Sequence, residues 1–190
     1  MKVLGLVCSP RKGGNTEIMV GEALDAVREL GGETELVTLA GKTITPCDAC
    51  AACRPKGGTC HVKDDMQEVY QQLINADGII FGSPVYFGNV SAQAKAVMDR
   101  TYAMLHQRQL RNKVAAAIVV TRRVGAGQAR GLLYNFFIAH RMLVAGGGIG
   151  YGRDKGEVRT GVGGSQDRTA LQEARGLGHA IVALLKQLGK

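Results

Sequence analysis

The sequence predicts an α/β protein with a doubly wound, five-stranded parallel sheet between two layers of helices, a three-layer αβα arrangement. Strand-like apolar runs alternate with helical patterns along the 190 residues, which is typical of βαβ units. Glycine-rich loops follow several of these strands, and ligands of such sheets bind beyond the carboxyl ends of the strands. A chain of this length is expected to form one domain, residues 1–190, with a cysteine-rich insertion at residues 46–61.

Five segments are expected to form the strands. Each is a short apolar or alternating run bounded by turn residues. The second run alternates polar and apolar residues like an edge strand, and the fifth ends in glycines. The expected strands span residues 3–8, 33–39, 78–82, 114–120 and 142–147.

Helices are expected between these strands and at the end of the chain. The first carries apolar residues on one face from Ile18 to Leu30. Asp64 and Gln67, at the start of the second, are spaced like a variant of the capping box. The later helices are expected at residues 64–74, 91–105, 128–140 and 166–188.

Composition limits the classes of partner. The net charge is +8, but the basic residues are scattered and only five Tyr and four Phe are present for base stacking, which argues against nucleic-acid binding. No apolar stretch approaches the roughly 20 residues of a membrane span. The first apolar run is too short for an export signal, so a cytoplasmic location is expected.

The loop after the first strand, residues 9–16, is suited to hold a phosphate group. It combines hydroxyls, two glycines and two cations at the start of a helix, where free backbone N–H groups and the helix dipole favour an anion. It matches neither the Walker A nor the dinucleotide-binding fingerprint. Ser9, Arg11, Asn15 and Thr16 are the candidate phosphate ligands. The alternative is an ordinary turn in which Asn15 caps the helix.

The loop after the third strand, residues 83–91, carries two aromatic residues where solvent is expected. Pro84 and Gly88 restrict its backbone, and Tyr86 and Phe87 are placed to stack on a flat ring system. The alternative is that both aromatic side chains enter the core or an oligomer interface.

The loop after the fourth strand, residues 121–128, again meets a helix start. Its free amides are suited to the carbonyl edge of a flat ligand, and its arginines to a negative charge there.

Together these loops resemble the NADPH-dependent FMN reductase family of flavodoxin-like proteins. The resemblance rests on residues 9–16, on residues 83–91 and on the following Lys95–Arg100 segment. It implies that residues 9–16 hold the FMN phosphate and that the other two loops flank the isoalloxazine ring. Phe87 stands where relatives often carry Trp or Tyr. The implied ring-binding residues are Ser83, Pro84, Val85, Tyr86, Phe87, Gly88, Asn89, Thr121, Arg122, Gly125, Gly127 and Gln128.

Four of the five cysteines lie close together, at Cys47, Cys50, Cys53 and Cys60. Structural disulfides are not expected in a cytoplasmic chain. Thiolates at this spacing can supply one sulfur to each iron of a cubane cluster, and the spacing resembles that of the iron–sulfur flavoproteins, a branch of the same family that pairs a [4Fe–4S] cluster with FMN. The alternatives are a zinc site, a redox-active disulfide, or a cysteine loop without metal.

The expected function is therefore electron transfer by an FMN-binding oxidoreductase, with electrons taken from a reduced donor and released through the cluster. NAD(P)H is a candidate donor, and the resemblance implies a homodimer or tetramer. The cofactors carry the chemistry, so no catalytic acid or base is expected. The alternatives are an NAD(P)H-dependent FMN or quinone reductase without a cluster, and a non-catalytic redox sensor.

Few other residues are assigned a role. Cys8 is expected to be a small buried residue. No role is expected for His106, His140 or His179. The glycine-rich segment 146–165 is long for a connection, and it could cover the flavin or contact a second subunit.

Overall fold

The computed structural model describes residues 1–55, 57, 59–161, 163–164 and 168–190. Its sheet has the strand order β2-β1-β3-β5-β6, and all four pairings along this path are parallel. This order is that of a flavodoxin-like sheet, which confirms the predicted class. A short sixth strand, β4, pairs antiparallel with β3. The strands are β1 (Lys2–Val7), β2 (Glu33–Thr38), β3 (Gly78–Tyr86), β4 (Asn89–Val90), β5 (Val114–Thr121) and β6 (Leu143–Tyr151).

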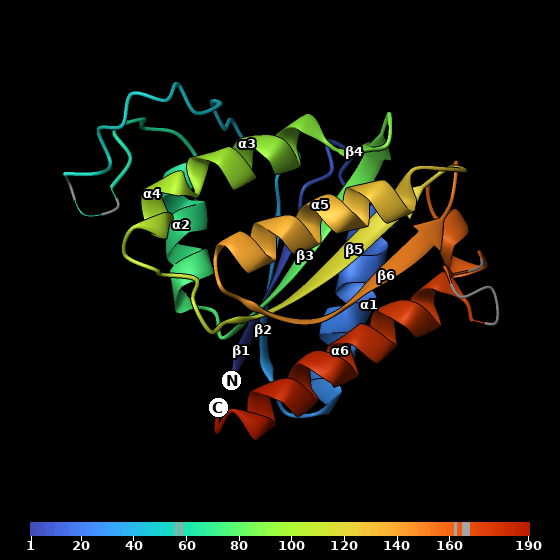
Figure 1. The fold of residues 1–190 in the computed structure, drawn as a ribbon. Coiled ribbons are helices and arrows are strands. Elements are labelled where there is room, and N and C mark those ends of the chain that lie inside the picture. Colours follow the sequence, from blue (N-terminus) through green and yellow to red (C-terminus); the bar gives the residue numbers. More distant parts are fainter. Residues whose placement is uncertain (56, 58, 162, 165–167) are drawn as a thin grey trace.

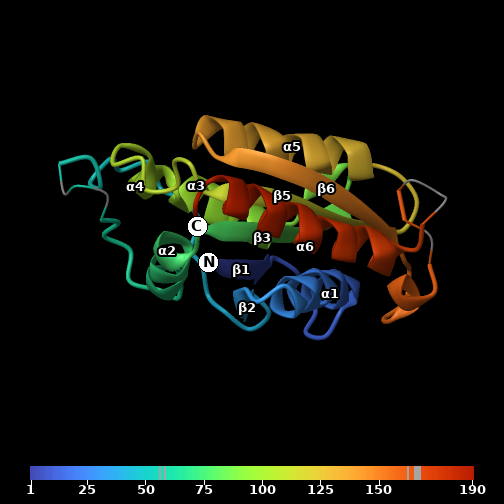
Figure 2. The same ribbon diagram turned by 90° about the horizontal axis from the view of Figure 1, so that it is seen from below.

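Helices cover both faces of the sheet and complete the three layers (Figures 1 and 2). The first and last helices pack together on one face, and the others lie on the opposite face or at its end. The helices are α1 (Asn15–Glu29), α2 (Met66–Asn75), α3 (Ala92–Arg100), α4 (Tyr102–Leu105), α5 (Ala126–Ala139), a 3-10 turn (Glu157–Arg159) and α6 (Ala170–Gln187).

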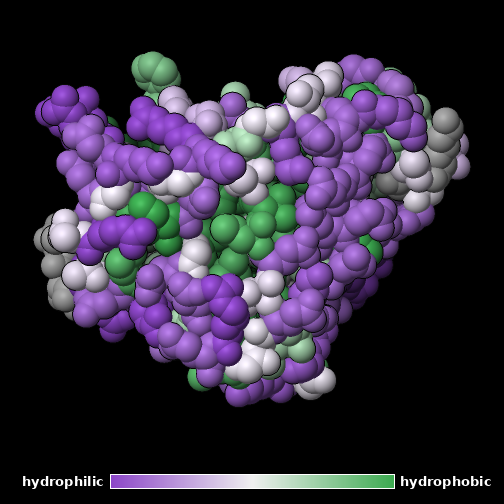
Figure 3. Space-filling model, turned by 180° about the vertical axis from the view of Figure 1, so that it is seen from behind, coloured by the Kyte–Doolittle hydropathy of each residue, from purple (hydrophilic) through white to green (hydrophobic). Residues whose placement is uncertain are grey.

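Two apolar clusters lie on the two faces of the sheet. One packs β1 and β5 side chains against α1 and α6, and the other packs the opposite face against α2, α3 and α5. Every residue of β5 is buried, as expected for a parallel strand covered on both sides. Apolar surface nevertheless gathers in the centre of the rear view, among mostly hydrophilic side chains (Figure 3).

The fifth predicted strand is longer than expected. Residues 146–151, expected as part of a glycine-rich connection, continue β6 to Tyr151. A Cβ atom at Gly147 would collide with the side chains of Tyr134 and Arg130 on α5. The glycine therefore leaves room for helix side chains that pack on the strand, and it does not mark a loop.

Other boundaries also shift. Residues 83–86 extend β3 and form a hairpin with β4, and α5 begins at Ala126, so Gly127 and Gln128 are helical. The helix expected over 91–105 is interrupted at Thr101. The last helix begins at Ala170, and the first residues expected for it, 166–167, lie outside the described residues.

The predicted capping box at Asp64 is wrong. Asp65 precedes α2 without capping it through its side chain. The Asp64 carboxylate does accept the Met66 N–H, but it also forms an ion pair with Arg100. Gln67 donates instead to the carbonyl oxygen of Val62. The tertiary ion pair outweighs the local motif.

No helix in the described part of the chain is long and apolar enough to span a membrane.

Candidate functional site

A cleft of about 400 Å³ opens at the carboxyl ends of the central strands. Four segments far apart in the sequence line it: the loop after β1, the end of β3, the end of β5 and the segment after β6. Nine of the sixteen predicted FMN-binding residues are among the lining residues, namely Ser9, Arg11, Asn15, Thr16, Pro84, Val85, Tyr86, Thr121 and Arg122.

The start of α1 presents free donors to this cleft. The first backbone bond of the helix runs from Ile18 N–H to the Gly14 carbonyl at 3.0 Å. Among the described residues, the N–H groups of Asn15, Thr16 and Glu17 have no acceptor, as is usual for the first turn of a helix. The side chains of Ser9 and Thr16 are buried beside them. This arrangement can bind an anion through backbone and hydroxyl donors.

Asn15 does not cap α1. Its side-chain amide donates to the Asp154 carbonyl at 2.8 Å, and its oxygen accepts the Gly156 N–H at 2.7 Å. Glu157 accepts the backbone N–H groups of Arg153 and Asp154, and these bonds hold the pKa of its carboxyl below the ordinary value. The segment after β6 is thereby fixed over the loop after β1.

This segment contributes residues that were not predicted as ligands. Gly152, Arg153, Asp154 and Lys155 all line the cleft. With Arg11 and Arg122 the lining carries four cationic side chains against one carboxylate, so its field favours an anionic ligand. The sequence signal for this contribution was the pair of cations, Arg153 and Lys155, shortly after the last strand.

The β3–β4 hairpin and the start of α5 pack backbone against backbone. Gly125 has φ +88°, and a Cβ atom there would lie 2.8 Å from Gly88 Cα. Tyr86 lines the cleft and is partly exposed, whereas Phe87 at the hairpin tip has φ +52° and a fully exposed side chain. The alternative in which both aromatic residues enter the core is therefore wrong.

Seven predicted ring-binding residues do not line the cleft as it stands. Ser83 is buried, where its hydroxyl accepts the Ser91 N–H at 3.0 Å and donates to the Pro84 carbonyl at 2.9 Å. The others lie on the hairpin tip or the first turn of α5 and are Phe87, Gly88, Asn89, Gly125, Gly127 and Gln128.

The four clustered cysteines line a second cavity, of about 560 Å³. All four thiols are free. Cys47 and Cys50 are exposed, Cys60 is half-buried and Cys53 is buried. Apolar side chains of α3, α4 and α5, such as Met98 and Phe136, form its floor. A set of soft thiol ligands around one partly apolar cavity fits a metal–sulfur centre.

Two further polar groups lie beside Cys50. Its Sγ is 3.3 Å from Nδ1 of His61, and Nε2 of His61 is 3.6 Å from an Asp48 oxygen. The three ligand atoms lie within 4.8 Å of one another, and all three residues are exposed.

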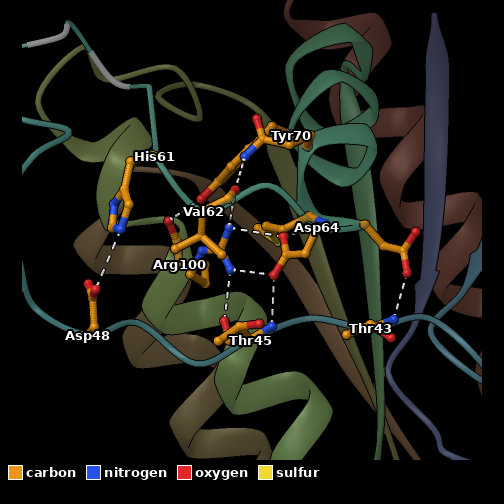
Figure 4. Close-up of polar contacts among 11 residues, drawn as sticks. Thr43, Thr45, Asp48, His61, Val62, Asp64, Tyr70 and Arg100 are labelled. Carbon is orange, nitrogen blue, oxygen red and sulfur yellow. Dashed lines mark hydrogen bonds and ion pairs between the residues drawn. The ribbon is translucent and has the colours of Figure 1, made fainter.

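Arg100, which also lines this cavity, belongs to a buried polar network with Asp64 and Tyr70 (Figure 4). Burial raises the pKa of Tyr70, and the nearby Cys60 adds to this increase. The Tyr70 hydroxyl also donates to the Arg100 carbonyl at 2.8 Å.

His140, to which the sequence assigned no role, is buried and has a polar and an aromatic partner. Its Nε2 lies 2.9 Å from Thr101 Oγ1, its ring packs on Phe136, and burial lowers its pKa. Cys8 is fully buried, as predicted, and burial raises its pKa well above the ordinary value.

The two cavities have no lining residue in common. Both ribbon views place the cysteine segment at one end of the molecule, beyond α2 and α4, and the segment after β6 at the other (Figures 1 and 2).

Known proteins resemble this chain along its length. Residues 1–154 match the family model described as NADPH-dependent FMN reductase. An iron–sulfur flavoprotein of Methanocaldococcus jannaschii is 41% identical over the whole of both chains. An iron–sulfur flavoprotein of Methanosarcina thermophila is 39% identical, over 80% of this chain and 81% of its own.

A solved structure shares the fold. RosB with bound 8-demethyl-8-formylriboflavin-5'-phosphate superposes with a TM-score of 0.78 at 18% identity, covering all of this chain and 80% of that one. Fold, motifs and relatives agree: the chain belongs to the NADPH-dependent FMN reductase family of flavin-dependent oxidoreductases, in its iron–sulfur flavoprotein branch.

Proposed function

We propose that the chain binds one FMN non-covalently in the 400 Å³ cleft and one [4Fe–4S] cluster on Cys47, Cys50, Cys53 and Cys60. It would transfer electrons between a reduced donor and an acceptor. The observation that carries the proposal is that all four cysteines of the motif, with free thiols, line a single cavity.

The residues of the cleft fit a flavin phosphate. Ser9 and Thr16 supply buried hydroxyls, and the first turn of α1 supplies N–H donors without acceptors among the described residues. Arg11 and Lys155 add positive charge at the rim. These groups would bind and orient the phosphate, as helix N-termini do in other proteins.

The ends of β3 and β5 fit the flat ring. Tyr86 and Val85 present apolar surface on one side of the cleft, and Thr121 and Arg122 lie on another. Phe87 stands free at the hairpin tip, and from there it can extend the aromatic surface over a bound ring. Five further residues would contact the ring from the same rim of the cleft, namely Gly88, Asn89, Gly125, Gly127 and Gln128. Buried Ser83 would hold the hairpin in place.

When bound, FMN exchanges electrons in pairs or singly, and an iron–sulfur cluster exchanges them singly. The protein's residues would hold the two groups and set their surroundings. No catalytic acid or base is proposed.

The decisive experiment measures iron, acid-labile sulfide and FMN in protein purified without oxygen. We expect about four irons per chain and one FMN. Cys53→Ser should lose iron and keep FMN. Cys8→Ser is the matched control, because Cys8 is free and buried but lies outside the cavity. Iron-free wild-type protein after reconstitution would refute the cluster.

A second function is favoured by the family model itself, which describes an NADPH-dependent reductase. Under this alternative, iron-free protein with bound FMN would still oxidise NAD(P)H rapidly with a flavin or quinone acceptor. Stopped-flow measurement of flavin bleaching by NADH and NADPH distinguishes the two functions. A homodimer or tetramer stays a prediction, which light scattering on the FMN-loaded protein would test.

A further inference from the structure

Arg100 is the last residue of α3, and its side chain is fully buried. Its guanidinium meets the Asp64 carboxylate with both nitrogens, Nη1 to Oδ2 at 2.8 Å and Nη2 to Oδ1 at 3.1 Å. Such a bidentate pair fixes direction as well as distance. The pair therefore gives α3 a rigid polar contact with the start of α2.

The same guanidinium binds the backbone on both sides of the cysteine segment (Figure 4). Nη1 donates to the Thr45 carbonyl at 2.8 Å, and Nη2 donates to the Val62 carbonyl at 3.4 Å. The Asp64 carboxylate also accepts the Thr45 N–H at 2.8 Å. Thr45 precedes Cys47 by two residues and Val62 follows Cys60 by two. One ion pair thus closes the base of the loop that carries all four thiols.

The third nitrogen of Arg100 is unused. Nε is buried and has no hydrogen-bond partner in the described part of the chain. A buried donor without an acceptor is costly and rare in native proteins. Arg100 and Cys60 line the same cavity, and Cys60 is among the groups that raise the pKa of Arg100 and of Tyr70.

We propose that Arg100 is a positioning residue for the iron–sulfur site: its two Nη groups hold the ends of loop 46–61 together, and its Nε–H donates to the Cys60 thiolate. The second part rests on the proposed cluster. A donor to a cluster sulfur stabilises the more negative, reduced state, so it raises the reduction potential.

A purely structural ion pair would leave the loop and the cluster unchanged when it is replaced by a neutral pair. The test therefore compares Arg100→Lys, Arg100→Gln and the double variant Arg100→Gln/Asp64→Asn with wild type. The double variant leaves no buried charge without a partner. Arg175→Gln is the matched control, since Arg175 also binds two groups, Glu22 and Glu29, but lies on α6.

The first readout is alkylation of iron-free, full-length protein by iodoacetamide, followed residue by residue by mass spectrometry. Cys53 is buried in the loop, Cys50 is an exposed internal reference, and Cys8 reports global unfolding. We expect Cys53 to react several-fold faster in the three Arg100 variants while Cys8 stays protected. Arg175→Gln should match wild type.

The second readout is the cluster itself. After anaerobic reconstitution, the three Arg100 variants should retain less iron at unchanged FMN content. Their remaining clusters should have more negative potentials in a redox titration followed by electron paramagnetic resonance. Arg100→Lys tests the planar guanidinium itself, because lysine keeps the positive charge but loses the group that donates several hydrogen bonds at once.

Unchanged Cys53 labelling in Arg100→Lys and in the double variant would overturn the loop closure. An unchanged potential in the same two variants would overturn the Nε–H donation to Cys60. A wild-type protein that takes up no iron would instead refute the proposed function, and Cys53 labelling would still decide the loop closure.

Discussion

Arg100 and Asp64 form an ion pair with an Nη1–Oδ2 distance of 2.8 Å, and their side chains are 0% and 6% exposed. Burial raises the pKa of Asp64, but hydrogen bonds from Arg100 and from the N–H groups of Thr45 and Met66 lower it more, so the net pKa lies below the ordinary value. The pair joins α2, α3 and the cysteine loop. Because it requires an ionised Asp64 carboxylate, the stability that it contributes depends on pH.

Asp64→Asn is expected to destabilise the protein by about 3–5 kcal/mol at pH 7, the usual effect of leaving one buried charge unpaired. The carboxylate stabilises the fold at pH values above its unfolded pKa of about 4, and this contribution disappears as the pH falls through the lower folded pKa. The difference between wild type and variant should therefore shrink below about pH 4. Urea unfolding at pH 7 and from pH 5 to 3 measures it.

Asp25→Asn serves as the control for this prediction. Asp25 pairs with Arg28 on exposed α1 surface, and such pairs contribute about 0–1 kcal/mol. Equal losses in the two variants would contradict the assigned role of Asp64.

Gly125→Ala is expected to destabilise the protein by at least about 1–2 kcal/mol, because its left-handed backbone disfavours a Cβ atom and that atom would lie 2.8 Å from Gly88 Cα. Separation of the two loops should also weaken FMN binding. Gly131→Ala is the matched control: it lies within α5, nothing lies within 4 Å of its added Cβ, and it should gain up to about 1 kcal/mol. Thermal unfolding and FMN titration of both variants check this, and equal effects would be inconsistent with close loop packing.

Thr16→Val is expected to weaken FMN binding by roughly tenfold to hundredfold, because a hydrogen bond to a charged group contributes about 1.5–3 kcal/mol. The buried threonine lies in the first turn of α1, and valine keeps its shape. Thr34→Val on β2 is the control, since Thr34 does not line the cleft. Fluorescence titration of FMN measures both, and an unaffected Thr16→Val would remove this residue from the phosphate site.

Phe87→Ala is expected to leave stability nearly unchanged, because the side chain is fully exposed. Loss of one aromatic contact with the ring should weaken FMN binding by roughly fivefold, or about 1 kcal/mol. Ile138→Ala removes another exposed apolar side chain, on α5, and should change neither the stability nor the affinity for FMN. If Phe87→Ala binds FMN like wild type and lowers the association state instead, the hairpin tip is a subunit contact.

His140→Gln is expected to flatten the stability profile between about pH 6.5 and 5. Burial lowers the pKa of His140, so below the unfolded value of about 6.5 the unfolded chain binds a proton that the native chain excludes. Wild-type stability should therefore fall as the pH falls through this window. Urea unfolding at several pH values tests this, with exposed His179→Gln as the control. Parallel profiles for wild type and His140→Gln would contradict it.

Local pattern was sufficient for most of the fold. Apolar runs located the parallel strands because a sheet covered on both faces requires them, and alternation identified β2 as an edge strand. The glycines of β6 led to the wrong prediction of a connection after residue 147. Glycine is common both in loops and where a helix packs closely on a strand. The pattern at Asp64 and Gln67 misled because a capping box and a tertiary ion pair use the same residue types.

The sequence by itself determined the family, the cysteine motif and the loop that follows β1, since each depends on residues close together in the chain. Only the tertiary structure decided which distant groups meet. It brought segment 152–155 to the cleft through Asn15 and fixed both ends of the cysteine loop on Arg100. It also separated the two cavities. The physical reason is that these contacts join residues far apart in the sequence, so they depend on how the sheet and its helices pack and not on local pattern.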